Sequence, residues 1–316
     1  MREITIGKND VGLRLDRFMQ KRFPGMPLPL LYKYIRKNCV KVNGKRRKEN
    51  YKLEQDDCIR FYISDEFFHT VASEPEFLRV RPCFDIVYED ENLLLVNKRA
   101  GLVVHEDNSQ TPNTLINQIK RYLYDKGEYR PQEENCFAPA LCNRIDRNTS
   151  GIVIAAKNAA TLRILNQKIK DRELTKTYLC LAFGHFRKKS GELTGYLVKD
   201  SEHNQVRIIK HPTPGAKTIV TRYRVQRQSA SMSLVEVELV TGRTHQIRAH
   251  LASIGHPLVG DGKYGKNADN KRAGFSHQAL CAYKLAFRFQ TDAGILSYLN
   301  GREFTVGDVD FVRKMC

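Results

Sequence analysis

The sequence of 316 residues has no closely spaced cysteine pair, no apolar run of membrane-spanning length and no N-terminal apolar stretch that resembles a signal peptide. Its eight cysteines never form a C-x-x-C pair, and most lie in apolar segments such as residues 178–181. This spacing argues against a disulfide framework or a zinc site, and it predicts buried free thiols in a reducing compartment. We therefore expect a cytoplasmic protein without a membrane partner.

Several catalytic signatures are missing as well. The sequence contains neither a P-loop nor a G-x-S-x-G motif, which argues against NTPases and hydrolases of those classes. Residues 260–265 fit G-x-G-x-x-G, but they neither follow a clear strand nor open a helix, so no dinucleotide site is expected. His245, His250 and His256 lack zinc-type spacing, and we predict no metal site.

Acidic residues are in short supply. Lys and Arg number 53 against 35 Asp and Glu, which gives a formal net charge of +18, and the mean hydropathy is −0.49. Residues 1–63 carry sixteen of the cations and seven of the acids, so this fifth of the chain holds half of the surplus. Because cations displace counterions from phosphates, the charge favours a nucleic-acid partner over a merely basic soluble protein, and it indicates a separate basic module.

The N-terminal module reads as two helices and a hairpin. We expect helices over 11–24 and from Pro29 to about residue 35, strands over 39–42 and 58–63, and a hairpin turn at Asn43-Gly44. Cations just after that turn, together with those on the helices, predict a phosphate-contacting face, although a solvated charge run is the alternative. The residues of this face are Arg14, Arg17, Arg36, Lys45, Arg46 and Arg47.

The rest of the chain reads as a linker at 64–80 and a larger domain at 81–316. Strands are expected at 92–98, 152–157, 176–183, 218–226 and 233–240, and helices at 112–124, 159–170 and 244–254. Asn300-Gly301 suggests a late hairpin. Because the strands and helices do not alternate regularly, we predict an α+β fold with a mixed, largely antiparallel sheet flanked by helices.

Asp146 is the first candidate for chemistry. It lies in the polar segment 142–151, between Arg144 and Arg147, and the segment runs directly into the apolar strand at 152–155. A carboxylate beside cations stays ionised and can act as a nucleophile or a base. An Asx-turn flanked by ordinary surface arginines explains the segment equally well.

A second polar segment covers residues 238–251. A strand ends at Val240, Thr244 is a plausible helix N-cap, and His245 and Arg248 lie one helical turn apart on neighbouring faces. Polar residues at a helix start suit a cleft, and a basic surface helix is the alternative. Tyr178, on the strand at 176–183, carries little information alone because strand tyrosines are usually core residues.

Taken together, the segments resemble the RluA family of RNA pseudouridine synthases. The resemblance rests on residues 143–151, 176–178 and 241–248, with residues 97–105 similar to the family's opening motif and residues 255–261 to its closing motif. It covers about residues 84–289 in the family's order. Residues 14–17 and 40–44 resemble the small alpha-L type RNA-binding domain that a ribosomal small-subunit protein shares.

The resemblance implies a pseudouridine synthase fold and an isomerase that needs no cofactor. It implies that Asp146 is the catalytic aspartate, that Tyr178 stacks on the target uracil, and that Arg248 pairs with Asp146. Arg144 would enter the RNA where the uridine has swung out, and Arg147, Arg243 and His245 would add RNA contacts. Asn143 stands where the family usually has histidine, which removes a possible ring contact near Asp146.

The expected substrate is structured RNA. Large-subunit ribosomal RNA is preferred because the accessory domain suits bulky RNA, tRNA is the alternative, and a monomer is the default. A non-catalytic RNA-binding protein would explain the charge and the N-terminal module equally well, but it would not explain the joint presence of Asp146, Tyr178 and Arg248.

Overall fold

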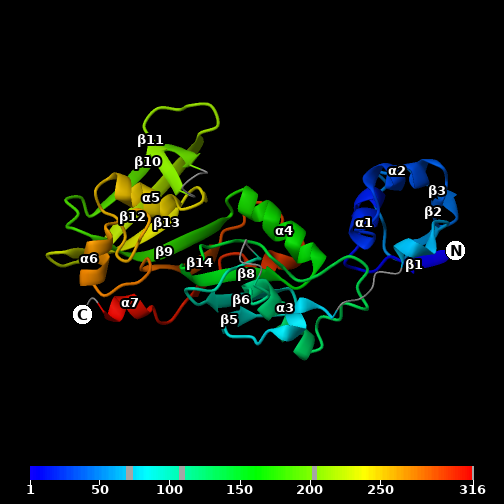
Figure 1. Cartoon of the computed structure of the whole chain (residues 1–316), viewed down its shortest axis with the longest axis horizontal. Coiled ribbons are helices and arrows are strands. Elements are labelled where there is room, and N and C mark those ends of the chain that lie inside the picture. The colour runs from blue at the N-terminus through cyan, green and yellow to red at the C-terminus, as the bar shows by residue number, and fades with distance from the viewer. Residues whose placement is uncertain (69–73, 107–110, 201–204, 315–316) are drawn as a thin grey trace.

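The computed structural model describes residues 1–68, 74–106, 111–200 and 205–314. The chain forms a small N-terminal unit around a four-stranded sheet and a larger unit around an eleven-stranded sheet (Figure 1). The expected α+β class with a mixed, largely antiparallel sheet is confirmed.

The N-terminal unit packs two helices against one face of its sheet. Its elements are β1 (Arg2–Thr5), α1 (Leu15–Arg22), α2 (Leu28–Arg36), β2 (Val40–Val42), β3 (Lys45–Arg46) and β4 (Cys58–Phe61), in the strand order β1-β4-β2-β3. Asn43 and Gly44 both have positive φ, of 52° and 75°, as a two-residue hairpin turn requires. This turn leaves Lys45 and Arg46 exposed at the sheet edge.

The segment 64–80 contains two short 3-10 helices, η1 (Asp65–Phe67) and η2 (Glu76–Arg79), on either side of undescribed residues. Phe77 is buried in the core of the larger unit. A second connection comes from the loop before β7 (Ala140–Leu141). There Asn135 Nδ2 donates to Thr5 O at 2.9 Å and to Asp10 Oδ2 at 2.8 Å, so this loop joins the larger unit to the N-terminal unit.

The large sheet follows the order β11-β10-β12-β13-β9-β14-β8-β6-β5, with β7 beside β8 and β15 beside β14. Its strands are β5 (Asp85–Glu89), β6 (Leu93–Lys98), β8 (Ser150–Ala156), β9 (Leu174–Phe183), β10 (Ser190–Asp200), β11 (Gln205–Ile209), β12 (Lys217–Gln228), β13 (Met232–Leu239), β14 (Leu280–Phe287) and β15 (Glu303–Thr305). Only the β8–β14 pairing is parallel among the described strands.

Helices cover the sheet at separate places. They are α3 (Leu115–Asp125), α4 (Ala159–Lys170), α5 (Gln246–Ser253), α6 (Asn267–Arg272), η3 (Gly294–Leu299) and α7 (Asp310–Arg313). Alternate residues of β6 and β8 pack toward α3 on one face and toward α4 and η3 on the other. Because both faces are buried, these strands have continuous apolar sequences instead of alternating ones.

The β8–β14 junction depends on Gly151. Its φ is +110°, and a Cβ placed there would lie 2.3 Å from Ala282 O of β14. Only glycine tolerates both the conformation and this close approach. Since Gly151 comes five residues after Asp146, the junction fixes where the Asp146 loop meets β9 and β14.

The expectation of buried cysteines was wrong for most of them. Among the seven described cysteines only Cys180 and Cys281 are buried, Cys83 is exposed and the others are half-buried; none of the seven forms a disulfide. An apolar neighbourhood in sequence does not fix burial, since strand neighbours point to opposite faces. In the described part, no group of three or more His, Cys, Asp or Glu could hold a metal ion, and no helix is long and apolar enough to cross a membrane.

Candidate active site

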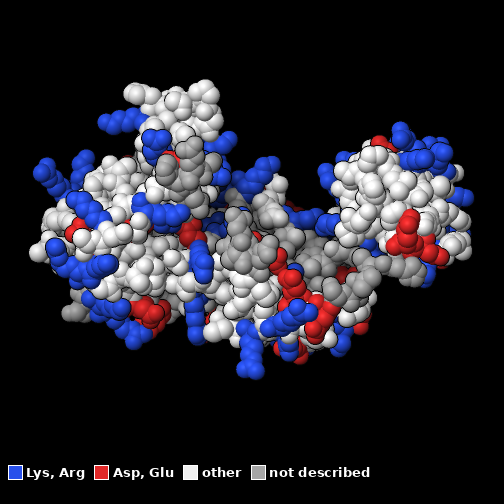
Figure 2. All heavy atoms as spheres, in the orientation of Figure 1, with Lys and Arg blue, Asp and Glu red and all other residues white. Residues whose placement is uncertain are grey.

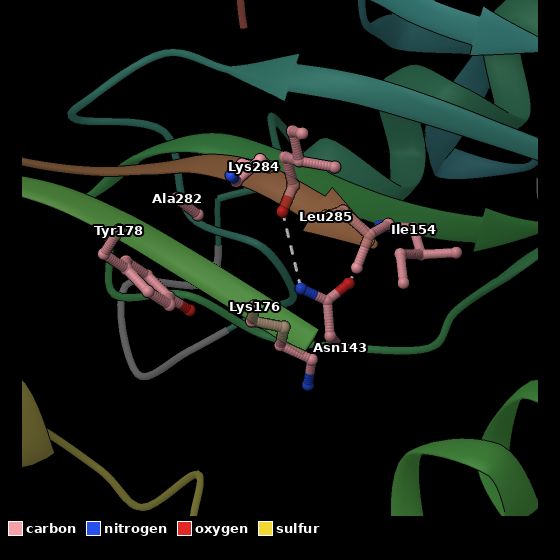
Figure 3. Close-up of a pocket in the computed structure, with 8 residues that line it drawn as sticks. Asn143, Ile154, Lys176, Tyr178, Ala282, Lys284 and Leu285 are labelled. Atoms are coloured by element: carbon pink, nitrogen blue, oxygen red, sulfur yellow. Dashed lines mark hydrogen bonds between the residues drawn. The ribbon is translucent and has the colours of Figure 1, made fainter. Parts of the chain in front are cut away.

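Asp146 lies on a turn between β7 and β8, with a side chain 27% exposed. The turn is closed by a hydrogen bond from Thr149 N to Asp146 O at 3.0 Å. Further upstream, Asn143 Oδ1 accepts from Ile154 N at 2.8 Å, and its Nδ2 reaches Ile152 O at 3.5 Å (Figure 3). Asn143 therefore ties the loop to β8 through its amide.

Arg248 links Asp146 to a second carboxylate. Its Nη1 donates to Asp146 Oδ2 at 2.8 Å, so the ion pair expected from the sequence is present. Its Nε and Nη2 donate to Asp261 Oδ2 and Oδ1 at 2.7 and 2.9 Å. Burial disfavours the charge of Arg248, which is 5% exposed, but the hydrogen bonds and charges of the two carboxylates outweigh this and raise its pKa. The site therefore holds a permanently charged guanidinium between two carboxylates.

The start of α5 differs from expectation. Thr244 does not cap the helix; the N-cap is His245, in the left-handed region at φ 52°, with no side-chain capping bond. Polar partners elsewhere hold the chain in this rarely populated conformation. His245 Nδ1 lies 3.0 Å from Tyr264 Oη, which accepts from Val206 N at 2.9 Å. His245 Nε2 faces Asp146 Oδ2 at 3.8 Å.

His245 is an uncharged neighbour of Asp146 near neutral pH. Burial lowers its pKa more than the charge of Asp146 raises it. Behind it, Gln246 Nε2 donates to Val220 O and Thr221 Oγ1 at 3.0 and 2.9 Å, and Gln246 Oε1 accepts from Thr241 Oγ1 at 2.9 Å. These bonds fasten the first turn of α5 to β12.

Lys98 is fully buried beneath the Asp146 loop and was not singled out from the sequence. Its Nζ donates to Arg99 O, Leu102 O and Arg147 O, each at 2.8 Å. Burial lowers its pKa to about 7, against the opposing attraction of Asp146. Lys98 thus joins the residues after β6 to the turn that carries Asp146.

Tyr178 lies on β9 and is 6% exposed. Burial, and then the charge of Asp146, raise its pKa, so the phenol stays protonated at neutral pH. Its ring borders a cavity of about 10 Å³, room for one water molecule, which Asn143, Lys176 and Lys284 also line (Figure 3). Tyr178 and Lys176, two residues apart, lie on the same face of β9. The structure therefore places Tyr178 within electrostatic range of Asp146.

The remaining site cations differ in availability. Arg144, Arg147 and Arg243 are exposed, and Arg147 Nε donates to Gly101 O at 3.1 Å. In the N-terminal unit, Arg17, Arg36, Lys45 and Arg46 are exposed.

Arg14 and Arg47 make contacts within the N-terminal unit that occupy their guanidinium groups. Arg14 pairs with the buried Asp16 through two nitrogens, at 3.1 and 2.7 Å, and Arg47 is half-buried over the Tyr51 ring at 4.5 Å. Figure 2 shows Lys and Arg side chains along the part of this unit where α2, β2 and β3 lie, and acidic side chains near β1. Arg14 is exposed but shares its charge with Asp16, whereas Arg17, Arg36, Lys45 and Arg46 are exposed and form no ion pair with any described residue.

Two residues that hold the site, Asp261 and Tyr264, were missed as functional candidates. Both lie in the 260–265 segment, whose G-x-G-x-x-G pattern gave neither of them a role in the site. Their contacts with Arg248 and His245 join residues at least thirteen positions apart, which no local pattern reveals. Its place in the closing motif of the RluA resemblance, residues 255–261, was the available signal for Asp261.

Comparisons with known proteins show the family of the chain. The family model described as RNA pseudouridylate synthase matches residues 92–253. A curated protein of Mycoplasma genitalium named uncharacterized RNA pseudouridine synthase is 36% identical, covering 90% of this chain and 88% of its own. Ribosomal large subunit pseudouridine synthase C of Escherichia coli K12 is 30% identical with the same coverage. The solved structure of human RNA pseudouridylate synthase domain containing 1 is 22% identical, with a TM-score of 0.55 over 74% of this chain and 94% of that one, and shares the fold.

Proposed function

This chain belongs to the RNA pseudouridylate synthase family and is an RNA pseudouridine synthase, and we propose that Asp146 is its catalytic carboxylate. We further propose that large-subunit ribosomal RNA is its substrate. The reaction is an isomerisation without net redox change. The bond between uracil N1 and ribose C1′ breaks, the detached uracil rotates, C5 bonds to C1′, and the proton leaves C5 while N1 gains one.

The hydrogen bonding of the Asp146 carboxylate is the observation that supports this proposal most directly. Its Oδ2 accepts from Arg248 at 2.8 Å, whereas no hydrogen bond to its Oδ1 occurs within the described part of the chain. A carboxylate held through one oxygen keeps its direction, and the second oxygen is free to act on the ribose or the ring. A mere turn-forming aspartate would need no buried guanidinium from a helix 102 residues further along.

Tyr178 and the exposed arginines have complementary roles in this proposal. Chemistry on a base requires the nucleotide to leave the stack, at a cost of a few kcal/mol that contacts in the site offset. The buried, protonated Tyr178 ring supplies a stacking surface and cannot act as the base at neutral pH. Arg144, Arg147 and Arg243 supply positive charge for the RNA around the emptied position.

The choice of RNA rests on the relatives and on the N-terminal unit. The relatives named ribosomal large subunit pseudouridine synthase C cover 90% of the chain, so their match must reach into residues 1–63. We propose that residues 1–63 form an RNA-binding domain whose cations, Arg17, Arg36, Lys45 and Arg46, hold structured ribosomal RNA. A tRNA substrate is the alternative, and mapping pseudouridines in total RNA with and without the gene separates the two.

Asp146→Asn tests the catalytic proposal. We expect pseudouridine formation to be lost while RNA affinity, measured by fluorescence anisotropy, stays within about two-fold because one partly exposed charge changes. Asp171→Asn, at an exposed aspartate, is the matched control and should keep full activity. If Asp146→Asn turned over RNA at the normal rate, the protein would be left as an RNA-binding protein whose catalytic group lies elsewhere.

A further inference from the structure

Asp261, the second carboxylate on Arg248, has no solvent exposure. Besides the two bonds from Arg248, its Oδ1 accepts from the backbone N–H groups of Lys263 and Tyr264, at 2.9 and 3.2 Å. Burial alone would raise its pKa, but these hydrogen bonds and the charge of Arg248 lower it. Asp261 is therefore an ionised group whose position is fixed by four hydrogen bonds.

This fixed carboxylate determines how Arg248 can point. A guanidinium is planar, and a two-nitrogen contact with a carboxylate fixes both its plane and its rotation. With Nε and Nη2 committed to Asp261, only Nη1 is left to reach Asp146. The Tyr264 ring, 5.3 Å from Arg248 Cζ, closes one side of the guanidinium.

The net charge of Asp146, Arg248 and Asp261 together also indicates a role for Asp261. Arg248 alone would neutralise Asp146 completely, whereas Arg248 shared between two carboxylates leaves the group of three with one net negative charge. A partly exposed Asp146, at 27%, then retains negative character toward a substrate. Asp261 thus supplies both an orientation and a compensating charge.

We infer that Asp261 is a positioning residue of the proposed reaction: it holds Arg248 so that Nη1 anchors one oxygen of Asp146 and leaves the other free. The inference rests on the proposed role of Asp146. Within the described part of the chain no hydrogen bond or ion pair joins Asp261 to Asp146 directly, so the effect of Asp261 passes through Arg248.

A double-mutant cycle on the full-length chain separates this role from a general contribution to stability. Single-turnover pseudouridine formation with excess enzyme would be measured for Asp261→Asn, Arg248→Met and the double variant. We expect Asp261→Asn to slow the reaction about 100-fold, the loss that a misplacement of about 1 Å causes. RNA affinity should stay within two-fold, because Asp261 is buried away from RNA.

In the Arg248→Met background, Asp261→Asn should cause no further loss. Because breaking the buried Arg248–Asp261 pair lowers the melting temperature in either case, the rates decide: a residue that only stabilises the fold would slow both backgrounds by the same factor. If Asp261→Asn fails to fold, Asp261→Glu, which keeps the charge on a longer arm, replaces it in the same cycle, with a smaller loss expected that again disappears beside Arg248→Met.

Two results would overturn the inference: a normal rate for Asp261→Asn or for its Glu replacement, or equal losses with and without Arg248. Asp146→Asn run in parallel identifies which proposal fails. An inactive Asp146→Asn beside a fully active Asp261→Asn removes the positioning role alone, whereas an active Asp146→Asn removes the catalytic assignment itself.

Discussion

Replacing Arg248 with alanine should damage this protein twice, once in stability and once in rate. The side chain is 5% exposed and donates three hydrogen bonds to two carboxylates. Without it, Asp261 keeps only two backbone N–H donors and lies in a place with no access to water. The buried carboxylate is then left without a counter-charge, which costs far more than the pair contributes when intact.

The size of the effect follows from burial. Breaking a buried ion pair by removing one partner costs about 3–5 kcal/mol. Asp146 adds little to that figure, because its partly exposed side chain regains water. In a unit of this size each kcal/mol shifts the melting temperature by about 2–4 °C, so we expect a fall of roughly 6–20 °C. The single-turnover rate should fall at least about 100-fold, since Asp146 loses its anchor.

Arg243→Ala and Arg248→Lys are the comparisons. Arg243 is exposed, so its loss should change stability by about 0.5 kcal/mol or less and should weaken RNA binding rather than the chemical step. Lysine at position 248 keeps the charge but cannot make the two-nitrogen contact with Asp261, so an intermediate rate is expected. Circular dichroism melts and rates measured well below the melting point test this, and equal effects of Arg248→Ala and Arg243→Ala would refute it.

Three further outcomes follow from single features. Gly151→Ala should lower the melting temperature severely or prevent soluble expression, because the new Cβ would enter the backbone of β14. The control Gly215→Ala, at φ +81° with nothing within 4 Å, should cost only about 1–2 kcal/mol of unfolding free energy. An equally small loss of stability in Gly151→Ala would contradict this explanation. Replacing Lys45 and Arg46 with glutamine should weaken RNA binding and reduce the slope of log affinity against log salt by about 1.4–1.8, and an unchanged slope excludes these cations from phosphate contact. Lys98, with a pKa of about 7, should lose its proton and one of its three hydrogen bonds as the pH rises, which gives activity an alkaline limb that is absent in Lys98→Met. Because the unfolded chain keeps that proton to about pH 10, the contribution of Lys98 to the unfolding free energy should rise between pH 7 and 10, and a fall in the wild type relative to Lys98→Met would contradict this.

The sequence predicted the parts of the fold that local pattern controls. Apolar runs located β6, β8 and β9, and the Asn43-Gly44 pair located the hairpin of the N-terminal unit. The ion pair between Asp146 and Arg248 was expected only through the resemblance to a family. Without that resemblance, the residues around Asp146 fitted a catalytic site and a simple Asx-turn equally well.

What the sequence did not predict depends on tertiary contacts. Thr244 has the side chain of a good N-cap, but the bonds of His245 and Gln246 to other strands impose a left-handed residue at the helix start. Lys98 looked like one cation among many, because only the folded chain surrounds it with three carbonyl groups. The proposed role of Asp261 depends on the place of Arg248 between two carboxylates, which lie 13 and 102 positions from it in the sequence.

Because all three guanidinium nitrogens of Arg248 are hydrogen-bonded to carboxylates, salt should affect RNA binding and the chemical step differently. Mobile ions screen exposed arginines such as Arg144 and Arg243 within about 10 Å at 0.1 M ionic strength, but they cannot enter the space between Arg248 and Asp261. Raising potassium chloride should therefore release the RNA from the enzyme while the rate of the bound complex stays constant.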